Sequence, residues 1–469
     1  MKAIMKVLGI DFGTTSFSAC VYDDEADQSW FAAGYNSSHK AAGLKREFRI
    51  DQVRQDLYSF IEKLSGEFSL AEIEAISVTG NMHSFFLVRE GQPITDIITW
   101  QDERVLEEHR DGLSYVEYVN ETFKPRFSRY QYRVSSGYAV TTLLHLLETG
   151  SLGAKGFAGC SLHFAPDLIV HELIHGSAPT EGAGITDHSL AHSSGLYDLE
   201  GKNWNRDLIE AMGYGEITFP KIAEPGTFLG VVGEHIPALR GVPVFLGMGD
   251  NQASVFGALM EDAANRQFHG RLECSRSVVL SMGTSGQVSA VVRDYPGDAR
   301  LIDCRPFLDG RMLLVGATLA CGRALHTVKD FIQSAARAIC QEGISDKQAY
   351  EVISQCILPS SPLKFQTTLN GTREHPDKRG SISNIDLSNF TLQNVVTSAA
   401  YGIVEELFGY YQEMDVECDA IIGVGNALRK NAFLVDIVSS VFGKNVRLSK
   451  VTEAASFGAA ACALRGLHS

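Results

Sequence analysis

The 469 residues suffice for two or three domains, and a hydrophobic content of 45% can bury substantial cores. With 41 basic and 56 acidic residues the formal net charge is −15, which disfavours nucleic acid or an anionic membrane surface as the main partner. Nine cysteines without a C-x-x-C pair indicate neither a zinc site nor a disulfide framework, and a reducing cytoplasm fits them best. Asp11 interrupts the first apolar run too early for a signal peptide, and no later run approaches the ~20 residues of a membrane span.

The first predicted element is a β-hairpin over residues 8–23, LGIDFGTTSFSACVYD. Apolar residues lead to Asp11, the chain turns through Gly13, Thr14 and Thr15, and alternating apolar residues resume. The tip offers a carboxylate for a hard cation, backbone amides that a glycine lets approach a phosphate, and two hydroxyls. This combination suits a nucleoside triphosphate with Mg²⁺, although an ordinary hairpin can carry the same residues.

An amphipathic helix is predicted over residues 51–64, because its apolar side chains share one face. Residues 75–88, AISVTGNMHSFFLV, then predict a buried strand, a turn at residues 80–83 and another strand. Strand, helix and strand in this order predict an α/β layered domain.

Trp100, Gln101, Asp102 and Arg104 fall together in the segment TWQDER. Flat, bidentate and charged side chains in one cluster suit a polyhydroxylated ligand. The structural alternative is that Trp100 belongs to the core and Asp102 pairs locally with Arg104.

The patterns between residues 112 and 239 are mixed. PDLIVHELIHG (166–176) and GKNWNRDLIEAMG (201–213) predict helices, whereas TDHSLAHSSGLYD (186–198) predicts a ligand-facing loop. The histidines of this region do not have the spacing of a zinc site completed by an acid.

A domain boundary is expected near residues 240–241, before the segment VPVFLGMGDNQASVFGALM (242–260). This segment predicts an apolar strand that ends in glycines, then Asp250 and an alanine-rich helix. An acid at the carboxyl end of a strand is where α/β folds keep their chemistry. Asp250 can also be a helix N-cap, and the two roles are compatible.

The second half of the chain repeats the outline of the first. VVLSMGTSGQVSAVV (278–292) predicts a second hairpin, with Gly283, Thr284 and Ser285 where the first has its Gly-Thr-Thr turn. Two such hairpins predict duplicated domains that face one nucleotide from opposite sides. This repeat strengthens the phosphate interpretation of both tips.

Two further elements are predicted near the end of the chain. Residues 419–443 indicate a strand, a glycine turn at Gly423 and Gly425, and a helix whose N-terminus could meet a phosphate or a nucleoside. Residues 453–466, EAASFGAAACALRG, indicate a helix of small residues, which is expected where a helix packs closely on backbone.

The sequence resembles the FGGY family of carbohydrate kinases. The resemblance covers nearly the whole chain and lies in an ordered set of motifs: GIDFGTTS, TGNMHSFF, TWQDER, GMGDNQASVFGA, SMGTSG, GVGNALRKN and EAASFGAA. Within the family the motifs TWQDER, GDNQASV, GTREHPD and GVGNALRKN are most similar to the sedoheptulokinase subfamily, and the xylulose kinases are next.

The resemblance implies an α/β fold of two actin-like, ribonuclease H-like domains with a deep interdomain cleft. Residues 1–243 would form the N-terminal domain with most of the sugar site, and residues 244–469 the C-terminal domain with most of the ATP site. Small-molecule sugar and ATP with Mg²⁺ would be the partners. Family members are often dimers, so the resemblance allows a homodimer, but the sequence itself does not give the oligomeric state.

The resemblance also implies roles by matching position. Asp250 would be the general base, and Asp11 would hold Mg²⁺ directly or through water. The ATP phosphates would be held by residues of both hairpin tips, namely Gly13, Thr14, Thr15, Gly283, Thr284 and Ser285. Gly425 and Asn426 would line the adenosine pocket. The ketose would be contacted by Met82, His83, Trp100, Asp102, Asp250 and Asn251.

One departure concerns Gly371-Thr372-Arg373, where family members commonly have Gly-Glu-Arg, so no catalytic role is assigned to that loop. The expected activity is phosphorylation of a terminal hydroxyl of a ketose by ATP, with sedoheptulose as the leading substrate. Xylulose, ribulose or a polyol of the glycerol type is the alternative substrate. A nucleotide-driven switch like actin or the chaperone ATPases is the alternative of another class, although a switch has no evident need for the polar set around Trp100.

Overall fold

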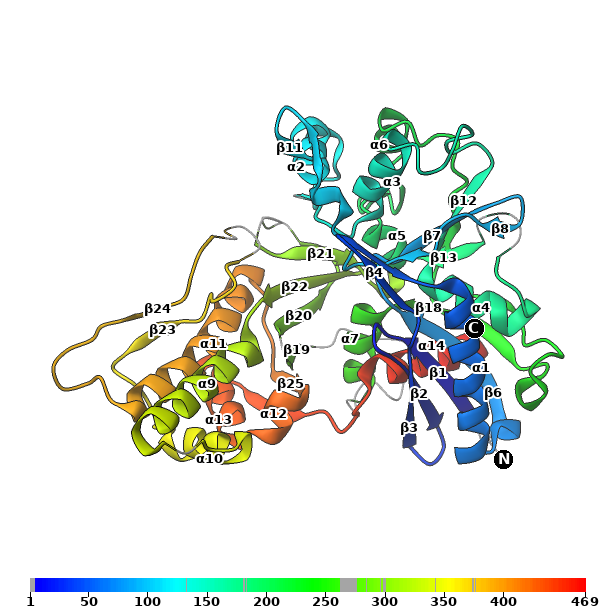
Figure 1. Cartoon of the computed structure of the whole chain (residues 1–469). Helices are drawn as coiled ribbons and strands as arrows, with labels where there is room; N and C mark the ends of the chain where they lie inside the picture. The colour runs from blue at the N-terminus through cyan, green and yellow to red at the C-terminus, as the bar shows by residue number, and fades with distance from the viewer. Residues whose placement is uncertain are drawn as a thin grey trace. The chain divides into compact units, whose positions relative to one another are not determined.

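The computed structural model describes residues 5–131, 133–179, 182, 184–261, 276–283, 285–295, 297, 301–341, 343–372, 375 and 377–469. Two compact units are present, and Figure 1 colours both along the chain. The first comprises Met1–Glu273, Arg305–Met312 and Val451–Ser469, and the second comprises Cys274–Cys304 and Leu313–Lys450. Thr284 and Arg373 lie outside the described residues.

The central sheet of the first unit has the strand order β17-β18-β6-β1-β2-β3. The bounds are Lys6–Phe12 (β1), Ser16–Asp23 (β2), Gln28–Tyr35 (β3), Ile73–Gly80 (β6), Phe228–Val231 (β17) and Pro243–Gly249 (β18). β1 pairs antiparallel with β2, which confirms the predicted hairpin, and β1, β6 and β18 are parallel neighbours. Because parallel strands end at the same edge, this sheet brings Asp11, Asn81 and Asp250 to one side of the unit.

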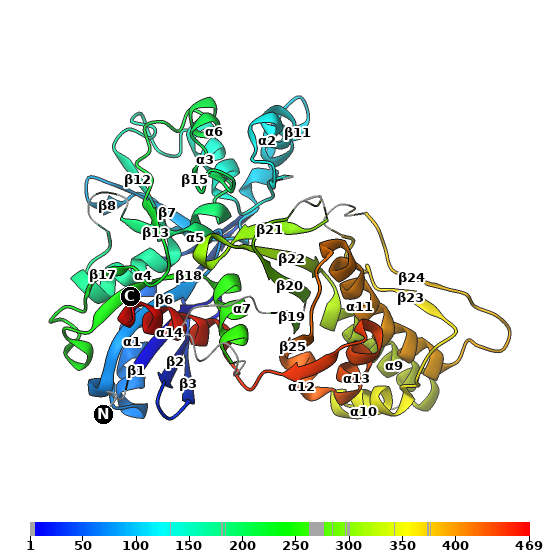
Figure 2. The ribbon, with the colours of Figure 1, turned by 180° about the vertical axis from the view of Figure 1, so that it is seen from behind.

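Helices cover both faces of this sheet, as Figure 1 and Figure 2 show from opposite sides. Their bounds are Ile50–Glu67 (α1), Ala165–His175 (α4), Asp250–Met260 (α7) and Ala454–Leu467 (α14). Leu8 and Ile10 share a core with α1 and α4. On the other face, a Cβ placed on Gly9 would lie 1.9 Å from the carbonyl oxygen of Ser456 in α14. The predicted small-residue helix therefore packs directly on the backbone of β1, and α7 packs on α14.

The sequence-based helix over residues 51–64 is confirmed by α1, whose buried face is the expected one: Val53, Leu57, Phe60, Ile61 and Leu64. The helices predicted at 166–176 and 201–213 are confirmed as α4 and as α6, Arg206–Ala211. The ligand-facing loop predicted at 186–198 is wrong, because this segment holds β13 (Ile185–Asp187), α5 (His188–Ser193) and β14 (Tyr197–Asp198). Asp187 starts α5 by accepting hydrogen bonds from the amides of Ser189 and Leu190.

A second sheet of the first unit has the order β12-β7-β9-β5-β4, with β8 beside β7. The bounds are His39–Ala42 (β4), Lys45–Phe48 (β5), Phe85–Arg89 (β7), Gln92–Pro93 (β8), Ile97–Ile98 (β9) and Cys160–Phe164 (β12). The other elements of this unit are Glu108–Arg110 (β10), Leu113–Ser114 (β11), Tyr115–Thr122 (α2), Ala139–Glu148 (α3), Asn203–Trp204 (β15) and Lys221–Ala223 (β16).

The second unit is built on a sheet of order β21-β22-β20-β19-β25-β26. The bounds are Ser277–Met282 (β19), Gly286–Val292 (β20), Asp303–Pro306 (β21), Met312–Thr318 (β22), Ala420–Val424 (β25) and Asn445–Leu448 (β26). β19 pairs antiparallel with β20 and parallel with β25, as β1 pairs with β2 and β6. The second predicted hairpin is thus confirmed, and the two sheets share the arrangement that a duplication predicts.

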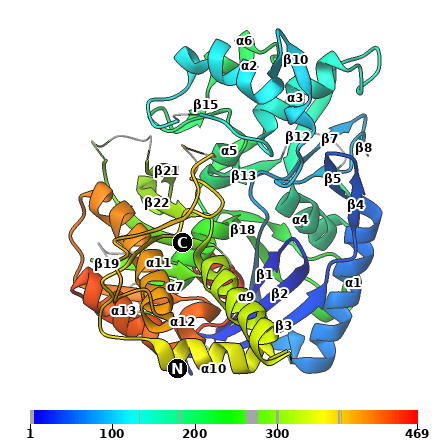
Figure 3. The same ribbon diagram turned by 60° about the vertical axis from the view of Figure 1, so that its left-hand side comes forward.

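Helices pack on this sheet and on one another, and Figure 3 shows α9, α11 and α13 together. The bounds are Cys321–Cys340 (α9), Asp346–Cys356 (α10), Leu392–Met414 (α11), Asn426–Lys430 (α12) and Ala432–Phe442 (α13), beside the strands Lys364–Gln366 (β23) and Ser381–Ser383 (β24). The single helix expected after Gly425 is two helices, because Asn431 has extended backbone angles that end the first.

The expected boundary at residues 243 and 244 falls inside the first unit, which contains both β18 and α7. The reason is pairing: β18 lies beside β6 in the central sheet, and α7 contacts α14. The assignment of sugar and ATP binding to residues 1–243 and 244–469 stays a prediction. A search of the helices in the described part of the chain for one long and apolar enough to cross a membrane finds none.

Candidate active site

Asp11 lies on β1, beside Thr79 of β6. Its Oδ1 atom is buried and has no hydrogen-bond partner among the described residues. Burial, with further contributions from the charges of Asp250 and Glu453, raises the pKa of Asp11 to about 8. The negative charges of Asp250 and Glu453 therefore act on Asp11, although the described residues contain no group of three or more acidic, histidine or cysteine side chains that could hold a metal ion. The motif EAASFGAA contains Glu453, but its place beside Asp11 was not visible in the sequence.

Asp250 is the first residue of α7, and Gly249, not Asp250, occupies the N-cap position. The Oδ1 atom of Asp250 accepts a hydrogen bond of 2.7 Å from the amide of Asn251. Burial raises the pKa of Asp250 to about 6, against the opposing effects of that amide and of the Arg305 guanidinium. A carboxyl with this pKa is ionised at neutral pH and can still accept a proton, as a general base requires.

Asn251 is held by Arg305, whose Nη1 donates to its Oδ1 over 3.0 Å. Arg305 lies on β21, more than fifty positions from Asn251 in the sequence, and no sequence motif pointed to it. The guanidinium thus orients the amide of Asn251 and also contributes positive charge beside Asp250.

Helix α5 supports the segments that carry the candidate base and the turn after β6. The hydroxyl of Ser189 accepts from the amide of Gly249 at 2.7 Å, directly before Asp250. The hydroxyl of Ser193 accepts from the amide of His83 at 3.0 Å. The segment predicted as a ligand-facing loop is therefore a buried support for the site.

Met82 and His83 follow β6 and differ in exposure. Met82 is only 5% exposed and packs against Gly249, so its place favours a supporting role behind the site. His83 adopts a left-handed backbone with a φ of 63°. Its Nδ1 lies 2.7 Å from the carbonyl oxygen of Ser193, so Nδ1 carries a proton and donates it to this oxygen. The ring also packs on Tyr138, with 4.4 Å between the centroids.

Trp100 links the TWQDER segment to the first hairpin. The side chain is 45% exposed, which contradicts the alternative that it belongs to the core. Its indole Nε1 donates to the Thr14 hydroxyl over 3.0 Å, and that hydroxyl donates to Oδ1 of Asn81 over 2.8 Å. Nδ2 of Asn81 in turn donates to the carbonyl oxygen of Phe12 over 2.7 Å. Three predicted motifs thus meet in one hydrogen-bonded chain.

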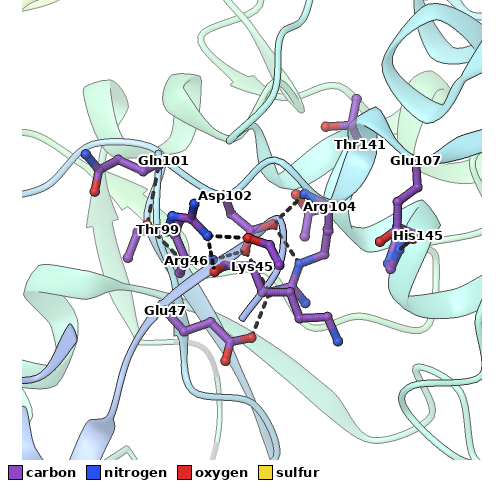
Figure 4. A network of polar contacts seen from close by, with 12 residues as sticks. Lys45, Arg46, Glu47, Thr99, Gln101, Asp102, Arg104, Glu107, Thr141 and His145 are labelled. Carbon is purple, nitrogen blue, oxygen red and sulfur yellow. Dashed lines mark hydrogen bonds and ion pairs between the residues drawn. The ribbon is translucent and has the colours of Figure 1, made fainter. Parts of the chain in front are cut away.

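Asp102 is fully buried, and Figure 4 shows the polar network around it. Its Oδ1 and Oδ2 accept from Nε and Nη2 of Arg104 at 2.7 and 2.8 Å. The amide of Arg46 donates to Oδ2 as well, over 2.7 Å, and Arg104 also binds Glu47. The structure therefore bears out the local pairing of Asp102 with Arg104, and this pairing favours a positioning role over a direct sugar contact.

The second unit contributes the other predicted nucleotide residues. The amide of Gly283 donates to the carbonyl oxygen of Ser285 over 2.9 Å, as Gly13 donates to Ser16 in the first hairpin. Gly425 has a φ of 97°, and a Cβ there would lie 2.4 Å from the carbonyl oxygen of Met282. Within this unit the turn before Asn426 is thus placed against the end of β19.

The family follows from comparison with known proteins. The N-terminal domain of the FGGY family of carbohydrate kinases matches residues 6–257, and its C-terminal domain matches residues 278–467. The chain belongs to the FGGY family of carbohydrate kinases. It is therefore a phosphotransferase with an alcohol group as acceptor, and its substrates are a small-molecule sugar and ATP.

Relatives of this FGGY kinase include a sedoheptulokinase and a xylulose kinase. A sedoheptulokinase of Mus musculus is 25% identical and covers 97% of this chain and 96% of its own. A xylulose kinase of Staphylococcus xylosus is 21% identical and covers 98% of this chain and 90% of its own. Among solved structures, a xylulose kinase from Lactobacillus acidophilus has a TM-score of 0.78 at 19% identity and covers 99% of this chain and 90% of its own. The expected actin-like α/β fold is confirmed by this similarity.

Proposed function

We propose that this FGGY kinase transfers the γ-phosphoryl group of ATP to a terminal hydroxyl of a ketose, with sedoheptulose as the leading substrate. The full-length similarity to a sedoheptulokinase supports that choice. The similarity to a xylulose kinase supports a five-carbon ketose as the alternative. In the transfer, the sugar oxygen bonds to the γ-phosphorus, the bond from this phosphorus to the bridging oxygen breaks, and ADP leaves.

The observation that carries the proposal is the position and protonation of Asp250. A carboxyl at the end of β18, with a pKa raised to about 6 by burial, is suited to take the proton of the attacking hydroxyl. Asn251 and His83, which are held by Arg305 and Ser193, would bind neighbouring hydroxyls of the sugar and orient it. Trp100 offers an exposed aromatic face for the carbon skeleton of the ketose.

Asp11 fits the role of Mg²⁺ ligand. Its buried Oδ1, without a partner among the described residues, is available to a cation or to a water bound by that cation. With a pKa of about 8 the Asp11 carboxyl keeps its proton at neutral pH until the cation displaces it. When bound, Mg²⁺ would neutralise charge on the phosphoryl oxygens. The amides at the tips with Gly13, Thr15, Gly283 and Ser285 would bind the phosphates, and the turn of Gly425 and Asn426 would bind the adenosine.

The test is the variant Asp250→Asn, which keeps the shape of the side chain and removes the base. We expect loss of sugar phosphorylation, measured by coupled ADP release, with MgATP and sugar still bound in calorimetric titrations. Asp167→Asn is the matched control, because Asp167 is also a buried carboxyl, with a pKa of about 7, but caps α4 through a hydrogen bond from the amide of Phe164 that asparagine can also accept. Near wild-type activity of Asp250→Asn would show that the base is another group.

A panel of ketoses and polyols in the same assay selects the substrate. The highest kcat/KM for sedoheptulose supports the leading choice, and the highest for xylulose, ribulose or glycerol replaces it. ATP hydrolysis that no sugar changes would favour the nucleotide switch instead.

A further inference from the structure

Asn36 follows β3 and is 0% exposed, and its amide nitrogen atoms bind the tip of the first hairpin. The side-chain Nδ2 donates to the carbonyl oxygens of Gly13 and Thr14, at 3.2 and 2.9 Å. The backbone amide of Asn36 donates to the carbonyl oxygen of Thr15, at 3.1 Å. One buried residue therefore donates hydrogen bonds to three consecutive carbonyl oxygens of the tip.

The orientation of Asn36 is itself fixed from the other side. Its Oδ1 accepts from the amide of Ser38 at 3.2 Å and from the hydroxyl of Ser38 at 2.6 Å. These two donors settle which atom of the side-chain amide is the oxygen, and so point Nδ2 at the hairpin. The next residue, Ser37, is bound through its amide and hydroxyl to Asp56 on α1, which anchors the segment to the helix.

These contacts, together with the geometry of the peptide unit, determine the direction in which the amides of the tip point. In a trans peptide unit the C=O of one residue and the N–H of the next point in opposite directions. With the carbonyl groups of Gly13 and Thr14 aimed at buried Asn36, the amides of Thr14 and Thr15 are aimed away from it. Within the described part of the chain, neither of these two amides has a hydrogen-bond partner. Thr15 is exposed, so the two amides lie on the outer side of the tip, where they can donate to a ligand.

We propose that Asn36 is the positioning residue of the phosphate site: it holds the carbonyl oxygens of the tip away from the ATP phosphates and presents the amides of Thr14 and Thr15 to them. The inference rests on the proposed function, because it takes ATP as the ligand of this hairpin. Asn36 itself does not touch the phosphates. Its effect is on the direction of the tip peptides and on the sign of the partial charge that they present.

The test compares Asn36→Asp and Asn36→Ala with Ser38→Ala in the full-length chain, by calorimetric titration with MgATP and with adenosine. Aspartate has the size of asparagine but cannot donate two hydrogen bonds, and alanine removes the contacts without adding charge. For both Asn36 variants we expect the affinity for MgATP to fall by about tenfold or more, with unchanged affinity for adenosine, which lacks phosphates. Ser38→Ala removes one of the two donors to Oδ1 but keeps the Ser38 amide and both Nδ2 contacts, so its loss of MgATP affinity should be smaller than that of either Asn36 variant.

The KM for ATP should rise in the Asn36 variants while the KM for the sugar stays the same, a split that a general loss of stability would not give. Circular dichroism establishes that each variant compared is folded. Wild-type affinity for MgATP in a folded Asn36→Ala overturns the role of Asn36, and so does an equal loss for adenosine and MgATP. A wild-type chain that binds MgATP but phosphorylates no sugar contradicts the proposed kinase reaction while the role of Asn36 in nucleotide binding stands. A wild-type chain that does not bind MgATP overturns both.

Discussion

The hydroxyl of Thr14 joins the first hairpin to the segments after β6 and β9, and its removal should impair catalysis. Thr14→Val keeps the shape of the side chain but deletes the acceptor of the Trp100 indole N–H and the donor to Asn81, at 3.0 and 2.8 Å. At about 0.5–1.5 kcal/mol for each bond, the two contribute ~1–3 kcal/mol, which corresponds to a fall in kcat/KM of about 5- to 150-fold if this free energy is lost from the transition state and not from the free enzyme. Coupled ADP release, with ATP and then sugar varied, measures the fall.

Two further variants show whether the hydroxyl acts through this chain of bonds. Thr14→Ser restores the hydroxyl and should recover most of the activity. Trp100→Phe keeps an aromatic ring but removes the indole N–H, so it should lose about half of the free energy that Thr14→Val loses. Wild-type kcat/KM for Thr14→Val refutes the reasoning. A large loss for Thr14→Val with none for Trp100→Phe shows that the indole contact is dispensable and that the hydroxyl acts through Asn81 or directly on the phosphates, the second of which the family resemblance implied.

Three more predictions concern the base, the metal and the packing beneath them. The kcat/KM for sugar should fall about tenfold per pH unit as the pH drops below the Asp250 pKa of about 6, because the protonated carboxyl is no longer a base. Arg305→Gln should move the midpoint of this pH profile upward, and a flat profile in both proteins would contradict the assignment. Asp11→Asn should raise the Mg²⁺ concentration that gives half-maximal rate, and an unchanged Mg²⁺ titration would count against Asp11 as a ligand. Gly9→Ala should lower the free energy of unfolding by about 1–3 kcal/mol or more in urea titrations, because its Cβ meets the backbone of α14. Gly66→Ala, whose Cβ has no atom within 4 Å, should be neutral or stabilising. Equal stability of the two variants would show that α14 can shift without cost.

The carboxyl groups at the centre of the site could be located from the sequence because strand and turn patterns are local. Alternating and continuous apolar runs place Asp11 near the end of one strand and Asp250 just after another, and both hairpins and α1 follow from the same reasoning. The order of the motifs also sufficed to suggest the family, which the two family domains then confirm.

The partners of these residues depend on which strands become neighbours, and no local pattern encodes that. Asn81 reaches the hairpin tip only because β6 pairs with β1 and puts Gly80 opposite Phe12. The support that Ser193 gives to His83 likewise depends on long-range packing. The start of α5 is different, because Asp187 caps it through the nearby amides of Ser189 and Leu190, a local signal that the sequence-based loop prediction missed.

Local patterns of residue types thus sufficed to predict the two glycine hairpins, the acids that follow the strands and the family. The fold was needed to establish that Met82 is buried, that Asp102 pairs with Arg104, and that Asn36 binds the first hairpin. Burial and hydrogen-bond partners depend on the groups that the fold brings near a side chain, and for Asn36 these groups come from a distant part of the chain.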